Sequence, residues 1–418
     1  MSTSPQRQGP PAWKAPLGVL SLLLATVIWC SGLFSSLSRP SVAPSLNLQQ
    51  QEMAVLAESA LSEDLRPVLL GEDEPRSALK NALIQLDEQQ RTPRQEQLLA
   101  LLEGELVRDP VASDPLLNLL ICELKDASSQ SCLDAALARS AALRLGFSAL
   151  LPLLTAGLGV VLLLVQGWRQ WRGRAAPWPE LRGPTLSLLD MALLVAGGFV
   201  VVSAVAVPLV VLPLVSSLTS AFESPRREAI GVVINYALMA LPSLLILRRQ
   251  LKDLPDAACP SGGWLQWRPQ PWGTALTAAA AGWLRITPIV MATGWLLVQL
   301  VGDPGGSNPL LELVLRSRDP LALTLLAFTA VVMAPLFEEV IFRGALLPVL
   351  ARRCGAVGGV VLSGLLFGMA HISIGELAPL TVLGIGLGLL RLSSGRLLPS
   401  VLMHGLWNAV TFVNLLVL

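Results

Sequence analysis

Long apolar runs dominate this chain, and they restrict its fold more than any other feature. A helix needs about 20 consecutive apolar residues to cross the hydrocarbon core of a bilayer. The run from Leu17 to Leu37 is long enough, and further runs follow from Leu145 onward. Charged residues make up 14% of the 418 residues, compared with roughly 25% in soluble globular proteins. The sequence therefore predicts an all-α integral membrane protein, a polytopic bundle of about eight or nine transmembrane helices.

The individual spans follow from the apolar runs and the polar segments between them. The run at 186–218 contains Pro208 and Pro213 and is too long for one straight span, so we expect it to be kinked or partly re-entrant. A signal peptide is the alternative for the first run, but the run is long for that role, which favours an uncleaved anchor. The expected spans are 17–37, 145–167, 186–218, 229–247, 272–301, 320–352, 355–371, 377–391 and 397–417.

A different composition marks residues 38–143, where charges are frequent and apolar residues recur at helical spacing between prolines. This pattern predicts a small soluble helical domain outside the membrane. It favours a spacer or cap, with partner recognition as the alternative. Cys122 and Cys132 both lie in it and could form a disulfide outside the cytoplasm. The expected division is a tail at 1–15, an anchor at 16–37, the soluble domain at 38–143, membrane helices at 144–301 and a second membrane region, the core that carries the motifs described below, at 320–417.

Short basic loops indicate the orientation in the membrane, because Lys and Arg concentrate on the cytoplasmic side. With the N-terminus in the cytoplasm, four basic clusters fall on that side, and the soluble domain and the C-terminus lie on the opposite side. The net charge of +1 gives no reason to expect nucleic acid as a partner. The four clusters are Arg169, Arg172 and Arg174; Arg248, Arg249 and Lys252; Arg352 and Arg353; and Arg391 and Arg396.

Ionisable side chains inside apolar runs are the main sign of function. Charge at membrane depth is costly unless it is paired or lines a wet cavity. Glu339 and Arg343 are four residues apart, which suits an ion pair within one helix. Glu338 points about 100° away from Glu339 and is available for another role. The only two histidines, His371 and His404, follow in apolar helices of their own.

The predicted hairpin brings these groups to one region. If the chain turns at 352–355, Glu338 and His371 both lie roughly 21–24 Å along their helices from the turn. His404 lies about 12 Å beyond Arg396 by the same rise, and helix tilt could bring it level. Pro335 should free backbone carbonyls near the acid. Glycines should let the helices approach closely: Gly364, Gly368, Gly384, Gly386 and Gly388.

Three motifs on successive apolar helices carry a family resemblance. They are Glu-Glu-x-x-x-Arg at 338–343, Phe-x-x-x-His at 367–371 and His-x-x-x-Asn at 404–408. In this order they resemble the CAAX protease and bacteriocin-processing family, intramembrane proteases related to the eukaryotic Ras-converting CAAX prenyl endopeptidase. The resemblance covers roughly residues 320–415 and leaves the soluble domain outside it.

The resemblance implies a role for each motif residue. Glu338, with His371, would activate water as a general base for attack on a peptide carbonyl. His404 and Asn408 would donate hydrogen bonds to the developing oxyanion. The remaining motif residues would support this centre: Glu339, Arg343 and Phe367. The expected substrate is a membrane-embedded or lipidated peptide or protein, bound from the surrounding lipid bilayer.

Metal use and other functions stay open at this point. Glu338, His371 and His404 also form a set of two histidines and one glutamate, as in catalytic zinc sites. The chain lacks a His-Glu-x-x-His helix, and we favour metal-free glutamate chemistry with Zn²⁺ as the alternative. A proton-coupled transporter would spread acids over several spans and contain internal repeats. A catalytically idle membrane scaffold or immunity protein of the same fold is the third class.

Overall fold

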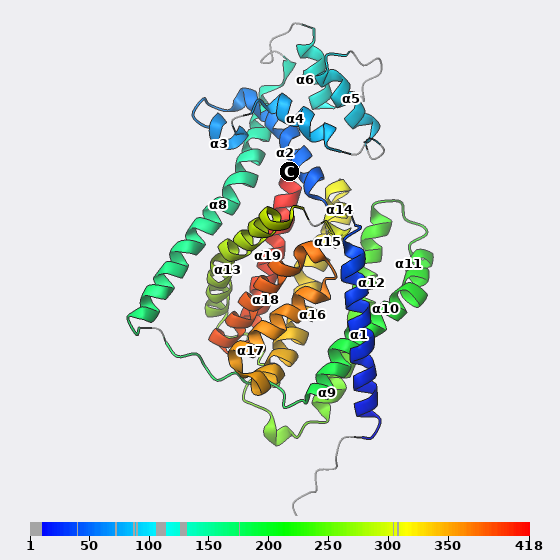
Figure 1. Cartoon of the computed structure of the whole chain (residues 1–418), viewed down its shortest axis with the longest axis vertical. Helices are drawn as coiled ribbons and strands as arrows, with labels where there is room; N and C mark the ends of the chain where they lie inside the picture. Colours follow the sequence, from blue (N-terminus) through cyan, green and yellow to red (C-terminus); the bar gives the residue numbers. More distant parts are fainter. Residues whose placement is uncertain are drawn as a thin grey trace, which may run out of the picture. The chain divides into compact units, whose positions relative to one another are not determined.

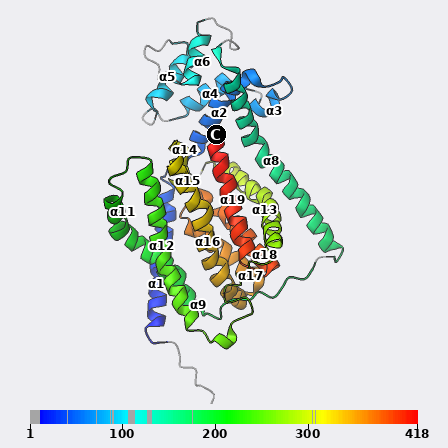
Figure 2. The ribbon, with the colours of Figure 1, turned by 180° about the vertical axis from the view of Figure 1, so that it is seen from behind.

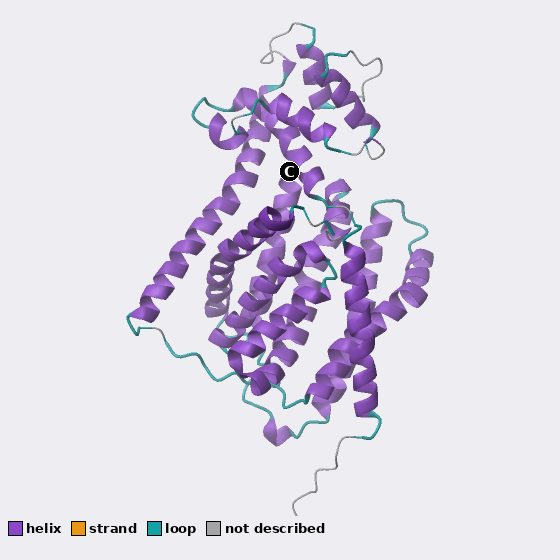
Figure 3. Ribbon diagram, in the orientation of Figure 1, coloured by secondary structure: helices purple, strands orange, loops and turns teal. Residues whose placement is uncertain are grey.

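The structure is a computed structural model that describes residues 11–418, except 40, 72, 87, 89–90, 106–113, 126–131, 175, 304 and 307–308. The regular elements in this part of the chain are all helices (Figure 3), which confirms the predicted all-α class. The chain divides into two compact units. We call residues 1–40 with 156–412 the membrane unit, and residues 41–155 with 413–418 the N-terminal helical unit.

Eight helical segments of the described chain are long and apolar enough to cross a membrane (Figure 1). One of them, Pro320–Ala370, has 51 residues and is broken at Gly355, where φ is 74° and ψ is 167°. Its two arms correspond to the predicted spans 320–352 and 355–371, so the protein is an integral membrane protein with several spans. The eight segments are Lys14–Ser36, Ala135–Trp171, Leu188–Leu218, Arg226–Lys252, Trp272–Val301, Pro320–Ala370, Ile374–Ser394 and Leu398–Val417.

Two of these segments are irregular in their middle. In Leu188–Leu218 the chain stays helical through both prolines but widens into π turns, so it is no re-entrant loop. The same widening occurs on both sides of the acids, where α16 (Ala334–Glu339) lies between η6 (Thr329–Met333) and η7 (Val340–Leu346). Such π turns are frequent at functional sites. The elements of the first segment are α9 (Leu188–Met191), η3 (Ala192–Val201), α10 (Val202–Ala206), η4 (Val207–Val211) and α11 (Leu212–Leu218).

The two arms of the broken segment pack against each other as the predicted hairpin. The second arm belongs to α17 (Leu347–Ala370). The Ser363 hydroxyl donates to the Phe342 carbonyl at 3.2 Å, and the rings of Phe342 and Phe367 meet edge to face at 5.5 Å. One helical turn beyond this ring contact lie Glu338 on the first arm and His371 on the second. The hairpin therefore brings these two residues to the same depth, as the sequence predicted.

Glycines set the contact between α17 and α18 (Ile374–Ser394), the next helix of the bundle. A Cβ at Gly364 would lie 2.8 Å from the Ile385 backbone nitrogen, and one at Gly384 would lie 2.8 Å from the Gly364 Cα. The two backbones touch, so only glycine fits at either position. Figures 1 and 2 show α17, α18, α19 (Leu398–Val417) and α13 (Trp272–Val301) side by side. The predicted glycine-mediated approach is confirmed.

Arginines from the predicted cytoplasmic clusters hold the loops at one end of the membrane unit. Arg352 donates to the carbonyls of Pro184 and Leu186 at 2.7 and 3.2 Å, and Arg391 donates to the Arg182 carbonyl at 2.7 Å. Arg391 is fully buried. These loops therefore lie against the helix ends, fixed by side-chain bonds to their backbone.

The N-terminal helical unit consists of short helices, three of which begin with a proline as their first residue. Proline suits this position because its missing N–H has no helical partner there. Thr92 and Asp114 cap two of the helices by accepting backbone N–H bonds. A disulfide joins Cys122 and Cys132, the pair that the sequence left open. The helices are α2 (Ala43–Ala57), α3 (Arg66–Leu70), α4 (Pro75–Ile84), α5 (Pro93–Leu102), α6 (Pro115–Glu123) and the first part of α8 (Ala135–Trp171).

Two arginines brace this unit, each between two acids. Arg94 binds Glu52 and Asp114, and Arg76 binds Glu58 and Glu123. Burial alone would raise the pKa of the Asp114 carboxyl. The hydrogen bond from Arg94 and the two capping N–H groups outweigh it, and the pKa lies below its usual value. Asp114 therefore contributes to folding mainly as a charged group.

Candidate active site

The Glu339–Arg343 pair is the buried centre of the site. Arg343 Nη1 donates to Glu339 Oε1 at 2.8 Å, and both residues are fully buried. Arg343 Nη2 donates to the Gly384 carbonyl at 2.8 Å, and its guanidinium carbon lies 4.4 Å from the centre of the Phe367 ring. The ion pair is as predicted. It also joins the first arm of the hairpin to α18, because the close glycine contact puts the Gly384 carbonyl within reach.

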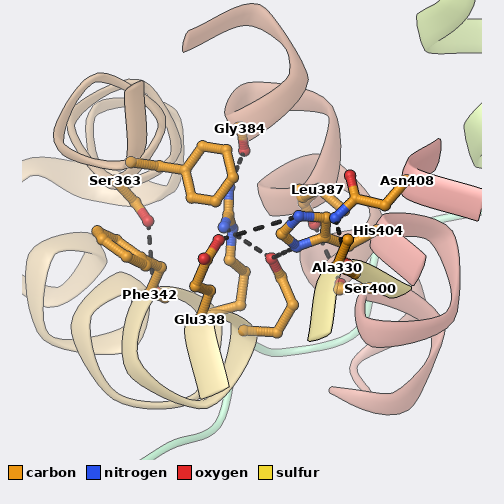
Figure 4. A network of polar contacts seen from close by, with 12 residues as sticks. Ala330, Glu338, Phe342, Ser363, Gly384, Leu387, Ser400, His404 and Asn408 are labelled. Atoms are coloured by element: carbon orange, nitrogen blue, oxygen red, sulfur yellow. Dashed lines mark hydrogen bonds and ion pairs between the residues drawn. The ribbon is translucent and has the colours of Figure 1, made fainter. Parts of the chain in front are cut away.

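Glu339 has a second partner that the sequence did not indicate. His404 Nδ1 lies 3.0 Å from Glu339 Oε1, and since a carboxylate only accepts, Nδ1 carries the hydrogen. His404 Nε2 then faces the other acid, 3.9 Å from Glu338 Oε2. Figure 4 shows Glu338 and His404 facing each other across this network. Glu339 therefore orients the His404 imidazole as well as neutralising Arg343.

His404 lies level with the acids, although its helical rise from Arg396 placed it nearer the cytoplasmic end. The reason is the turn that precedes α19, which lies inside the protein. Leu397 is fully buried, and its N–H donates to the Gln266 carbonyl at 2.9 Å. Arg396 donates to the carbonyls of Arg268 and Pro269, both at 2.9 Å. The loop before α13 thus covers this turn and fixes the start of α19 within the bundle.

Glu338 is buried but has one free oxygen. It is 9% exposed, and its Oε1 accepts a hydrogen bond from the Tyr236 hydroxyl at 2.9 Å. Its Oε2 has no hydrogen-bond partner among the described residues. Tyr236 lies on α12 (Arg226–Lys252), and sequence reasoning missed it. The chain has a single tyrosine, and its position in an apolar span was the one signal that could have drawn notice.

His371 ends the second arm, and Phe367 holds its ring. Its Nδ1 lies 2.8 Å from the Phe367 carbonyl, which can only accept, so Nδ1 carries the hydrogen and Nε2 is the ring nitrogen left for another partner. The Phe367 ring lies 4.8 Å from the ring of His371 and 5.5 Å from that of His404. Phe367 therefore separates the two imidazoles. Within the described chain no hydrogen bond joins His371 to Glu338, although the hairpin puts them at the same depth.

Asn408 compensates for a proline. Its Nδ2 donates to the Ala330 carbonyl at 2.7 Å. Ala330 precedes Pro335 by five residues, the hydrogen-bond spacing of a π turn, and proline has no N–H to give. The carbonyl freed by Pro335 is thus bound by a side chain from α19. One N–H of the Asn408 amide is engaged in this way, and the second is available to another acceptor.

The loop after His371 is held by α1 (Lys14–Ser36) and the residues that follow it. Ile372 has a φ of +51°, a rare value for a β-branched residue. The Arg39 guanidinium donates to the Ile372 carbonyl, and the Ile374 N–H donates to the Ser36 hydroxyl at 2.9 Å. The Ser373 hydroxyl donates to the Gly306 carbonyl at 2.6 Å. These bonds offset the strained backbone and fix the chain immediately after the histidine.

The positions of Glu338, His371 and His404 bear on the zinc alternative. Among the described residues, no three His, Cys, Asp or Glu side chains are grouped closely enough to hold a metal ion. In both imidazoles Nδ1 is engaged, by Phe367 in one and by Glu339 in the other. This leaves both Nε2 atoms free, as in zinc-bound histidines, which usually donate their other N–H to a carbonyl or carboxylate; what speaks against a shared metal ion in the described chain is the spacing of the three side chains.

Taken together, the fold and the site define a polytopic membrane protein with a buried carboxylate–imidazole cluster. Residues 320–410 match the family model described as type II CAAX prenyl endopeptidase Rce1-like. This confirms the resemblance to the CAAX protease family over that range, and it supports a protease. Residues 43–108 match a domain of unknown function, DUF8675. No curated protein and no solved structure shows significant similarity to the chain.

Proposed function

We propose that this protein is an intramembrane endopeptidase that hydrolyses a peptide bond near the cytoplasmic half of the bilayer. The observation that carries the proposal is Glu338 itself. It is a buried carboxylate with one oxygen bound and the other free, and it lies within the region that matches the endopeptidase family. A transporter would need ionisable groups along a path through the membrane, whereas both acids of the motif, Arg343 and His404 lie in one cluster of mutual contacts.

Water activation would use the free oxygen of Glu338. A water molecule held there and by the free Nε2 of His371 would lose a proton to Oε2 as its oxygen attacks the substrate carbonyl carbon. The carbonyl oxygen becomes an oxyanion, and the C–N bond breaks as Glu338 returns the proton to the leaving nitrogen. His371 and Glu338 need not touch, because one water can bridge them; hydrogen bonds of this kind often tighten only when substrate is bound.

Oxyanion stabilisation would come from α19. The free N–H of Asn408 can donate while the other holds Ala330. His404 already gives its Nδ1 hydrogen to Glu339, so it can donate from Nε2 only as an imidazolium. Glu339 and Glu338 together would compensate the charges of that imidazolium and of Arg343. One such donor commonly contributes about 10²–10³ in rate.

The proposed substrate is a lipidated C-terminus or another membrane-embedded peptide, because the site lies within spans and belongs to a CAAX-type region. We propose that the N-terminus is cytoplasmic and that the N-terminal helical unit is extracytoplasmic. The basic clusters support this orientation. The disulfide between Cys122 and Cys132 is consistent with it, because disulfides persist in oxidising compartments.

The test is cleavage by the full chain in proteoliposomes, with a fluorogenic prenylated CaaX peptide and a fluorogenic single-span peptide as probes. We expect Glu338→Gln and His371→Ala to lower kcat by about 10²–10⁴-fold, the usual contribution of general acid–base catalysis. The control is Glu228→Gln, which neutralises an exposed acid on α12 and should cleave like wild type. Wild-type turnover in Glu338→Gln would refute the water-activating role. No cleavage of either peptide by wild type would favour an idle scaffold of the same fold.

The same preparation tests the metal-free chemistry that we favour. Metal content is measured on wild type and His371→Ala, and cleavage is assayed before and after chelation. We expect chelation to leave kcat unchanged and both proteins to carry the same background metal. About one zinc per chain, lost in His371→Ala and required for cleavage, would replace the glutamate mechanism with a zinc mechanism.

A further inference from the structure

One contact of Glu338 comes from outside the region that matches the endopeptidase family. The Tyr236 hydroxyl donates to Glu338 Oε1 at 2.9 Å, across 102 residues of sequence. The matched region begins at residue 320. The sequence motifs supply Glu338, His371, His404 and Asn408. Among these four residues, none donates a hydrogen bond to Glu338 Oε1. The carboxylate that would activate water is therefore oriented by a helix that the motifs do not include.

The phenol is held in place by its surroundings. The Tyr236 ring meets the Phe337 ring edge to face, with centres 6.1 Å apart and planes at 86°. Phe337, next to Glu338 in the chain, in turn contacts Phe199 of η3 at 5.5 Å. Helix α12 also packs against α15 (Pro320–Phe328) and η6, the elements that lead into the acids. Tyr236 is thus part of the packed aromatic core and has little freedom to turn away from the carboxylate.

The hydrogen bond between Tyr236 and Glu338 determines which carboxylate oxygen stays free. In this contact the hydroxyl donates to the carboxylate, which fixes the rotation of the carboxylate and occupies Oε1. Oε2 remains as the oxygen that can accept a proton from water, and it faces the His404 Nε2 at 3.9 Å. Without the hydroxyl, the carboxylate of Glu338 could rotate and present either oxygen in several directions.

We infer that the active site extends to α12, and that Tyr236 is a positioning residue that fixes Glu338 with Oε2 toward the reacting water. This inference rests on the proposed function, because positioning has a catalytic meaning only if Glu338 activates water. Tyr236 acts through Glu338 and touches no other residue of the catalytic set by a hydrogen bond within the described chain. Its loss should therefore lower kcat more than it changes KM.

The hydrogen bond can be observed without any substrate, because the chain contains one tyrosine. Full-length protein carrying an isotope label at the tyrosine Cζ carbon gives one NMR signal, which reports the bonding of the hydroxyl. We expect this signal to move by more than its linewidth in Glu338→Gln, where a neutral amide replaces the charged acceptor. In Glu228→Gln, an exposed acid on the same helix, it should stay in place. An unmoved signal in Glu338→Gln would overturn the inference.

The functional consequence is tested with Tyr236→Phe, which keeps the ring against Phe337 and removes only the hydroxyl. We expect kcat for the cleaved probe peptide to fall about 10- to 100-fold, with KM within about twofold, as for loss of one hydrogen bond to a charged catalytic group. Thr287→Val is the matched control. It removes a buried hydroxyl whose hydrogen-bond partner in the described chain is the Trp283 carbonyl of its own helix, and it should leave kcat unchanged. Wild-type kcat in Tyr236→Phe would refute the positioning role.

The two measurements separate this inference from the proposed function. If Glu338→Gln abolishes cleavage but leaves the tyrosine signal unmoved, the inference fails and the proposed function stands. If Glu338→Gln still cleaves, the proposed function fails. The positioning role then fails with it, even if the tyrosine signal moves.

Discussion

The buried Glu339–Arg343 pair gives the sharpest prediction about stability. Glu339→Gln keeps the size of the side chain and an oxygen that can accept from Arg343, and it removes only the charge. Arg343 would then be a fully buried cation, 0% exposed, with the amide oxygen, the Gly384 carbonyl and the Phe367 ring as neutral partners and Glu338 as the other acid that acts on it. We therefore expect a large loss of stability from this near-isosteric change.

The magnitude follows from the geometry. At the 2.8 Å separation of the pair, Coulomb attraction is roughly 6 kcal/mol with an effective dielectric constant of about 20. Desolvation of the two charges offsets much of that, so the intact pair contributes little net stability. Removing one partner leaves the desolvation of the other uncompensated, which costs about 3–5 kcal/mol. Glu339→Gln should lower the free energy of unfolding by this amount.

The assay measures unfolding of the full-length protein in mixed micelles, with circular dichroism as the signal. Wild type, the two single variants and the double variant are compared as a double-mutant cycle. Arg343→Met alone should destabilise as well, because His404 is then the remaining hydrogen-bond partner of the buried Glu339 among the described residues. The double variant Glu339→Gln with Arg343→Met should recover to within about 1 kcal/mol of wild type, since no unpaired charge remains. It should stay impaired in cleavage, because the His404 Nδ1 no longer faces a carboxylate.

Two results would refute this reasoning. A loss below about 1 kcal/mol in Glu339→Gln would mean that Arg343 is solvated or finds another counter-charge. A double variant as unstable as the sum of the single variants would mean that the two side chains do not interact as a buried pair.

Two further predictions concern packing and pH. Gly364→Ala should lower the free energy of unfolding by about 1–3 kcal/mol, because its Cβ would lie 2.8 Å from a backbone nitrogen of α18. Gly167→Ala, whose Cβ would meet nothing within 4 Å, should leave the unfolding midpoint in place or raise it, and equal midpoints for both variants would contradict the close packing. The Asp114 carboxyl has a lowered pKa when folded, so its contribution to stability is present above about pH 4 and is lost as pH falls further. Hydrogen exchange of the α6 backbone should show this loss of stability in wild type but not in Asp114→Asn, which keeps the helix cap. Identical pH profiles for the two proteins would refute the predicted role of the Asp114 charge.

The sequence predicted those parts of the site that depend on spacing within a helix or across one tight hairpin. The Glu339–Arg343 pair needed only the four-residue spacing of an α-helix. The shared depth of Glu338 and His371 needed only a turn near Gly355. The ion pair and the shared level of the two residues are both present in the structure. The hydrophobic runs determine where each arm of the hairpin begins and ends, and arms of these lengths can pair in one register.

The sequence did not predict contacts between distant segments. Glu339 and His404 are 65 residues apart, and their contact depends on a turn before α19 that lies inside the protein, beneath the loop at 253–271. Helical rise alone left the level of His404 open, and its contact with Glu339 shows that it lies beside the acids. The support of the chain after His371 by α1 depends equally on how the helices are arranged around the hairpin.

What the amino-acid sequence determined by itself is the class of protein, its spans and the set of groups available for chemistry. These follow from local properties: apolar length for crossing a bilayer, and the cost of charge inside it. Only the tertiary structure decided which oxygen of Glu338 is free, because that depends on Tyr236, a residue 102 positions away. A lipid bilayer fixes each helix in depth but leaves its neighbours and its rotation to side-chain packing, so partners across the bundle are decided by the complete fold.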